Sequence, residues 1–88
     1  MNLSQFKKTI KPGVKMKVID HMRKEAIGRC CTVEKVQSNS LCNIYEDDTQ
    51  KNKVWIDFPK ASNFSFENDV AKFYFPDNKL IVAFQIIG

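Results

Sequence analysis

The sequence is poor in the residue types from which active sites and metal centres are usually built. Its 88 residues include only three glycines, three prolines, three cysteines and one histidine. Gly13, Gly28 and Gly88 stand far apart, so no glycine-rich loop is present that could hold a phosphate group. No serine, threonine or cysteine lies in a motif that places a nucleophile beside a base. We therefore expect a protein that is not an enzyme and that uses no cofactor.

The cysteines form neither a metal-binding nor a disulfide pattern. Cys30 and Cys31 are neighbours in a predicted strand, where adjacent side chains point to opposite faces. With Cys42 they make an odd number, and His21 does not stand at the spacing of a zinc finger. We expect no metal, and we expect reduced thiols that serve as small core residues.

Long apolar runs are also absent. No stretch approaches the roughly 20 apolar residues that a membrane helix needs, and residues 1–8 lack the apolar core of a signal peptide. A content of 43% hydrophobic and 27% charged residues is typical of a globular protein. We expect one domain, 1–88, with a cytoplasmic location and no membrane partner.

What the sequence does contain is a period of two in hydrophobicity, interrupted by turn residues, between Val14 and Phe58. Such alternation puts one set of side chains on a core face and the other in solvent. Asn78, in the loop after Pro76, stands where a left-handed residue closes a hairpin. The expected strands are 14–21, 29–36, 41–46 and 53–58, followed by a hairpin of 71–75 and 80–87.

A short helix is expected before the first strand. Leu3, Phe6 and Ile10 stand at helical spacing, and Pro12 followed by Gly13 ends the segment. The connection 60–69 carries two phenylalanines that we expect to enter the core. Together these elements predict a mainly β fold with one short N-terminal α-helix and a C-terminal hairpin. The sheet is expected to be a small antiparallel SH3-like barrel or, alternatively, a strongly bent open sheet.

The last predicted strand is apolar on both faces, with only Gln85 polar between Leu80 and Ile87. Such a strand is either sandwiched inside the fold or presented to a partner. Because it is the last strand of the chain, we expect that it could lie at an edge of the sheet. An edge there would allow a homodimer to form by strand addition.

Two groups of residues are candidates for binding a protein. Trp55 is out of phase with the inward residues of its strand, and Tyr45 lies on the neighbouring strand. With Lys53 they could form an exposed aromatic surface, or Trp55 could pack beneath another segment. The second group is an acidic hairpin tip, which is either a solvated turn or a knob that enters a basic groove. It consists of Glu46, Asp47 and Asp48.

The positive charge is concentrated near the N-terminus. Residues 1–24 contain seven lysines and arginines against Asp20 alone, within a net charge of +4 for the whole chain. Such a distribution attracts anionic partners, DNA or RNA among them, although a solvated lysine face has the same composition. The candidate basic patch consists of Lys7, Lys8, Lys11, Lys15 and Lys17.

Three segments, LSQFKK (3–8), KPGV (11–14) and VWIDFPKA (54–61), resemble small uncharacterised accessory proteins encoded by phages and prophages of Gram-positive bacteria. The resemblance implies a binding protein in the host cytoplasm, of the kind represented by host-takeover proteins and anti-CRISPRs. Its partner would be a host protein or a protein–nucleic-acid complex, such as a CRISPR effector, that it inhibits stoichiometrically. A nucleic-acid-binding SH3-like module and an oligomerising phage assembly protein are the alternatives.

Overall fold

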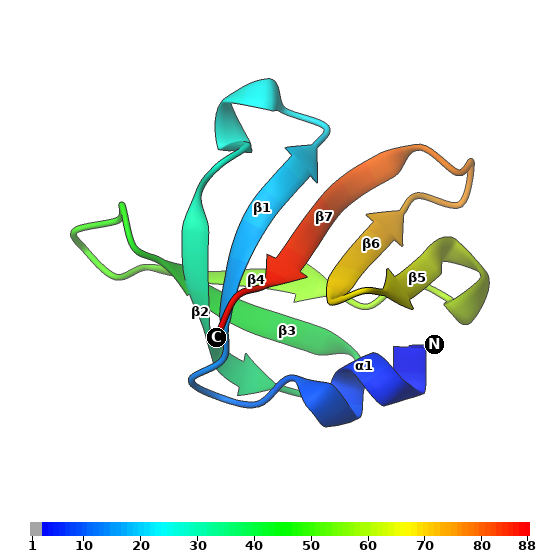
Figure 1. Ribbon diagram of the computed structural model, residues 1–88, viewed down its shortest axis with the longest axis horizontal. Helices are drawn as coiled ribbons and strands as arrows, with labels where there is room; N and C mark the ends of the chain where they lie inside the picture. The colour runs from blue at the N-terminus through cyan, green and yellow to red at the C-terminus, as the bar shows by residue number, and fades with distance from the viewer. Residues whose placement is uncertain (1–2) are drawn as a thin grey trace.

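Seven antiparallel strands form one continuous sheet in the computed structural model, which describes residues 3–88 (Figure 1). The elements are α1 (Leu3–Thr9), β1 (Lys15–His21), η1 (Lys24–Ala26), β2 (Cys30–Val36), β3 (Ser40–Tyr45), β4 (Lys53–Asp57), η2 (Ala61–Asn63), β5 (Phe64–Glu67), β6 (Val70–Tyr74) and β7 (Leu80–Ile86). The strand order is β4-β3-β2-β1-β7-β6-β5. The predicted mainly β fold is confirmed. The sheet does not close into a barrel, and β4 and β5 are its edges.

The sheet bends so that its two halves face each other. In Figure 1, β3 and β4 run across the view behind β1 and β7. The register shifts between Val18 and Asp20 in β1 and between Val33 and Lys35 in β2. Such bulges bend a strand and increase its twist. The side chains inside the bend form the core, and α1 covers one end of it.

Phenylalanines dominate the core under α1. The Phe6 ring centroid lies 5.1 Å from those of Phe64 and Phe66 and 6.0 Å from that of Phe73. Phe58, just after β4, completes the group at 6.4 Å from Phe6. The expectation that the phenylalanines of the 60–69 connection enter the core is thereby confirmed, since Phe66 is buried and Phe64 packs against the core. The cluster holds the helix and both edges of the sheet together.

The predicted edge position of the last strand is wrong. β7 lies inside the sheet and pairs with β1 on one side and β6 on the other. Its Val82 and Phe84 belong to the core, and Ala83 on the other face is only 1% exposed. Pairing on both sides satisfies the backbone groups of a strand that is apolar on both faces, which an edge position would leave open. Strand addition at β7 is therefore excluded.

The predicted left-handed residue at Asn78 is confirmed. Asn78 is left-handed, with a φ of 67°, and closes the β6–β7 turn. Gly13 has a φ of 99° at the exit from α1, a conformation that favours glycine. All three cysteines are free, with Cys31 and Cys42 buried and Cys30 half-buried. Burial raises the pKa of the Cys31 thiol to about 12, so this thiol stays protonated at neutral pH. Within residues 3–88, no helix is long and apolar enough to cross a membrane.

Candidate functional site

Tyr45 and Trp55 do not form the shared aromatic surface predicted from the sequence. Tyr45 belongs to the core and is only 8% exposed. Trp55 pairs with Cys42, whereas Tyr45 lies three residues further along β3. Because side chains alternate along a strand, an odd separation puts Tyr45 and Trp55 on opposite faces of the sheet. The two residues therefore share no exposed face, although both of them line one hollow beside β4. The sequence does not show how the two strands are aligned.

Trp55 itself is exposed, and it lies on an edge strand. Its exposed fraction is 47%, and that of Val54, on the other face of β4, is 43%. The interpretation in which Trp55 packs beneath another segment is therefore wrong. Lys53, at the start of β4, is also exposed. Two half-exposed large apolar side chains on one edge strand are a feature that folding alone does not require.

The open side of β4 can be assigned from its pairing with β3. Phe58 donates its backbone N–H to the Asn39 carbonyl over 3.0 Å. Alternate residues of an antiparallel strand direct their N–H and C=O groups to the same neighbour, so Val54 and Ile56 also face β3. The backbone groups of the remaining residues point away from the sheet. These residues are Lys53, Trp55 and Asp57, and no strand of the described chain lies beyond them.

A groove runs beside β4 on the core side of the sheet. It consists of two adjoining hollows of about 190 and 250 Å³ that share His21, Tyr45 and Val54. We call it the β4 groove. The smaller hollow is further lined by Asn43, Trp55, Ile56, Ile81, Val82 and Phe84, and the larger one by Arg23, Glu25, Ala26 and Arg29. The groove therefore separates β4 from the facing ends of β1 and β7.

Asn43 lines the smaller hollow and carries a buried polar atom that has no partner in the described part of the chain. Its side chain is 1% exposed, and its Oδ1 is buried without a hydrogen-bond partner among residues 3–88. The register puts Asn43 opposite Val54 and between Leu41 and Tyr45, on the core face. An unsatisfied buried polar atom costs about 1–3 kcal/mol. Sequence reasoning missed Asn43, although a polar residue at an inward position of an apolar strand is a signal that the sequence carries.

His21 and Tyr45 supply further polar groups to the groove. The Arg23 backbone N–H donates to His21 Nδ1 over 2.8 Å, so the proton of the neutral imidazole lies on Nε2. Burial raises the pKa of Tyr45 to about 12, so its hydroxyl remains protonated at neutral pH. Apart from these groups, the smaller hollow is lined mainly by aliphatic and aromatic side chains.

Arg29 closes the groove at the β1–β2 end. Its guanidinium lies 4.1 Å from the Tyr45 ring centroid and donates to the Asp47 carboxylate through Nε and Nη2, both at 2.9 Å. The hydrogen bonds from Arg29 lower the pKa of Asp47, and the same contact raises that of Arg29. One member of the predicted acidic tip thus fixes the guanidinium over the tyrosine ring.

The other acidic residues are arranged as in a turn. Asp48 accepts the backbone N–H groups of Gln50 and Asn52 over 3.0 and 3.1 Å, which shapes the β3–β4 hairpin. Glu46 is exposed at the end of β3. Asp47 and Asp48 therefore have partners within the protein.

Asp47 gives a prediction for pH dependence. Because its pKa is lowered in the folded state, the contact with Arg29 stabilises the fold above the ordinary aspartate pKa of 3.8 and is lost as the pH falls through the lower folded value. At neutral pH, we expect the Asp47→Asn variant to unfold at a lower urea concentration than the unaltered protein. Below the folded-state pKa of Asp47, we expect both proteins to unfold at the same urea concentration. Urea titrations at neutral pH and at a pH below the folded-state pKa of Asp47 measure the two unfolding midpoints. A difference that persists in acid would show that Asp47 acts through packing instead.

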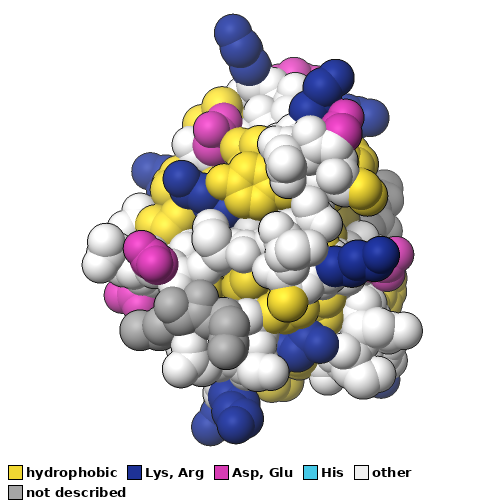
Figure 2. All heavy atoms as spheres, turned by 90° about the vertical axis from the view of Figure 1, so that its right-hand side faces the viewer, with side chains coloured by type: hydrophobic (Ala, Val, Ile, Leu, Met, Phe, Trp, Pro, Cys, Tyr) yellow, Lys and Arg dark blue, Asp and Glu magenta, His cyan; other side chains and the backbone are white. Residues whose placement is uncertain are grey.

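The lysines of the candidate basic patch do not share one role. Lys7 donates to the Ser38 carbonyl over 2.7 Å, and its Nζ lies 4.6 Å from the Phe58 ring centroid. Lys8 and Lys11 are exposed near α1, whereas Lys15 and Lys17 project from the outer face of β1. On the face in Figure 2, the Lys and Arg side chains stand apart, with apolar and uncharged surface between them.

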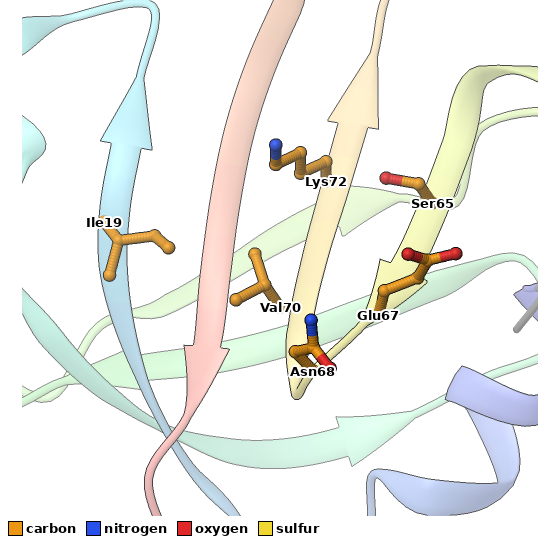
Figure 3. Close-up of a pocket in the computed structure, with 6 residues that line it drawn as sticks. All are labelled: Ile19, Ser65, Glu67, Asn68, Val70 and Lys72. Carbon is orange, nitrogen blue, oxygen red and sulfur yellow. The ribbon is translucent and has the colours of Figure 1, made fainter.

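A third hollow lies on the outer face of the sheet and measures about 520 Å³. Figure 3 shows Ile19 on β1 facing Val70 and Lys72 on β6 across β7, with Ser65 and Glu67 on β5 beyond them. All the residues that line it are exposed or half-buried. A hollow without a desolvated polar group offers little that would select a ligand.

Within residues 3–88, no three His, Cys, Asp or Glu side chains are grouped in a way that could hold a metal ion. The β4 groove, with the open edge of β4 beside it, is therefore the candidate site that the geometry favours. Comparisons of this chain with protein-family models, with curated proteins and with solved structures gave no match.

Proposed function

We propose that this protein acts by binding one partner protein stoichiometrically through β4 and the β4 groove. The observation that carries the proposal is the half-exposed Trp55 on an edge strand whose outward backbone groups have no neighbour in the described sheet. Tryptophan is enriched among the residues that dominate interface energetics, and an open edge pairs readily with a strand from another chain. The adjoining groove adds apolar surface and buried polar groups that can select one partner.

The resemblance to phage-encoded accessory proteins indicates the class of partner to test first. We propose a host protein, or the protein component of a nucleic-acid-handling or defence complex, that is inhibited by this binding. Direct nucleic-acid binding is less favoured because Lys7, one of the five candidate lysines, is held by Ser38 and Phe58. An assembly role through β7 is less favoured because both sides of that strand are paired.

Affinity purification from a lysate of the host cell, with and without nuclease, tests the proposal. We expect a nuclease-resistant partner that forms a complex of fixed stoichiometry in light scattering. Trp55→Ala is expected to weaken this complex about thirtyfold, since loss of a central interface residue costs about 2 kcal/mol. Ile87→Ala is the matched control, because Ile87 is 51% exposed and lies beyond β7.

Two outcomes would overturn the proposal. Loss of all captured material after nuclease treatment, with affinity that falls steeply with salt, would identify nucleic acid as the ligand. Equal binding by Trp55→Ala and the unaltered protein would exclude β4 as the binding surface.

A further inference from the structure

The β4 groove has features that specify more than a general protein contact. The outward backbone groups of Lys53, Trp55 and Asp57 form an open row of donors and acceptors. Beside this row, the smaller hollow is lined by Asn43, whose buried Oδ1 accepts no hydrogen bond from residues 3–88. Val54 of the edge strand pairs with Asn43, and both residues line this hollow, so the edge and the buried acceptor belong to one site.

We propose that the partner contributes an extended segment that adds to β4 as a further strand and places a neutral hydrogen-bond donor on Asn43. The inference rests on the proposed function and specifies its partner. Only an extended backbone can pair with the open row at successive alternate residues. A hydrogen bond from the partner to Asn43 then explains why a polar residue lines a hollow that is otherwise mainly apolar.

The geometry fixes how the added strand is placed. In antiparallel addition, the pairing that every neighbouring pair of strands in this sheet uses, the partner residues that bond to Lys53, Trp55 and Asp57 direct their own side chains to the outer face, next to Trp55. The residue between two of them faces inward, as Val54 and Ile56 do, and enters the smaller hollow. One inward side chain therefore decides specificity, and its neighbours supply main-chain hydrogen bonds.

The lining of the hollow limits what this inward side chain can be. A volume of about 190 Å³ between Ile56, Ile81 and Phe84 suits a large, mainly apolar side chain. The Asn43 acceptor requires an N–H or O–H on it. A charged group is disfavoured because the hollow provides no opposite charge to offset its desolvation. Tryptophan and tyrosine satisfy both conditions, and we take tryptophan as the test case.

A short peptide tests the inference without knowledge of the natural partner. The probe is the blocked pentapeptide acetyl-Thr-Val-Trp-Val-Thr-amide, in which the two valines would pair with β4 and the tryptophan would face inward. The control peptide carries benzothienylalanine instead of tryptophan, which replaces the indole N–H by sulfur at nearly the same shape. A second control is methylated on the backbone nitrogens of both valines, so that it cannot donate to the edge.

Binding and amide hydrogen exchange are followed by NMR. We expect the tryptophan peptide to protect the backbone amides of Lys53, Trp55 and Asp57 and to shift the side-chain amide signals of Asn43. The benzothienyl peptide is expected to bind about tenfold more weakly, because one buried hydrogen bond is lost. The methylated peptide is expected to give no protection. In Asn43→Leu, the preference for tryptophan over the benzothienyl group should disappear.

The inference is overturned if the edge amides gain no protection, or if Asn43→Leu still prefers the indole. A host partner that is captured in a Trp55-dependent manner, while the peptides fail, would disprove strand addition and leave the proposed function standing. Peptide binding without any captured host partner would support strand addition and contradict the proposed function. The two proposals can therefore fail independently.

Discussion

Replacing Phe6 with alanine is expected to lower the free energy of unfolding by about 3–5 kcal/mol, the usual cost of removing a buried phenylalanine. The Phe6 side chain is fully buried and contacts four other phenylalanine rings contributed by β5, β6 and the end of β4. A loss of this size is a large part of the stability of a small domain. Urea denaturation followed by circular dichroism measures it.

Two variants make the Phe6 prediction specific. Phe6→Leu keeps most of the buried volume and should lose less stability than Phe6→Ala. Lys8→Ala changes an exposed position of the same helix and should alter stability by less than about 0.5 kcal/mol. A seven-residue helix is not stable alone in water, so α1 depends on this contact. If Phe6→Ala cost less than about 1 kcal/mol, α1 would not be part of the cooperative core.

Replacing Asn43 with leucine is expected to stabilise the protein, by about 1–3 kcal/mol, and to impair binding. The Asn43 side chain is buried and its Oδ1 has no partner among the described residues, so the folded state bears a desolvation cost that leucine removes. Most core substitutions destabilise, which makes the expected sign informative. Functional sites commonly retain residues that reduce stability.

The Asn43 experiment needs a control that separates polarity from shape. Leu41→Asn introduces the same amide at the neighbouring inward position of β3, where the residue is fully buried in the core. It should destabilise strongly because it creates both a cavity and an unpaired group. If Asn43→Leu also destabilised by more than about 1 kcal/mol, the amide would contribute to folding, and its assignment to a ligand would be wrong.

Much of the local structure could be predicted from the sequence because it depends on short-range patterns. Helical spacing identifies α1, alternation identifies the strands, and Asn78 indicates the last turn. The inward positions of Met16 and Val18 follow from the period of two and are confirmed by burial. The two phenylalanines of the 60–69 connection enter the core as the sequence predicts, and large aromatic side chains gain most from leaving water.

The errors all concern strand order and register, which depend on contacts between distant parts of the chain. β7 was expected at an edge because it comes last, but it lies between β1 and β6. The sequence places Tyr45 and Trp55 on neighbouring strands. Trp55 pairs with Cys42, however, which is three residues from Tyr45, so the two side chains lie on opposite faces of the sheet. Asn43 was overlooked because the sequence does not show that a hollow forms beside it.

The exposed edge strand β4 has some features that follow from the sequence and others that depend on the tertiary structure. The alternation of Val54, Trp55 and Ile56 by itself determined that a strand forms there and that Trp55 opposes the inward set. Only the tertiary structure decided that this strand lies at the edge, that Val54 is half-exposed beside a groove, and that Asn43 is buried without a partner. The physical reason is that side-chain alternation is a local property of the backbone, whereas edge, groove and burial depend on which distant strands pack together.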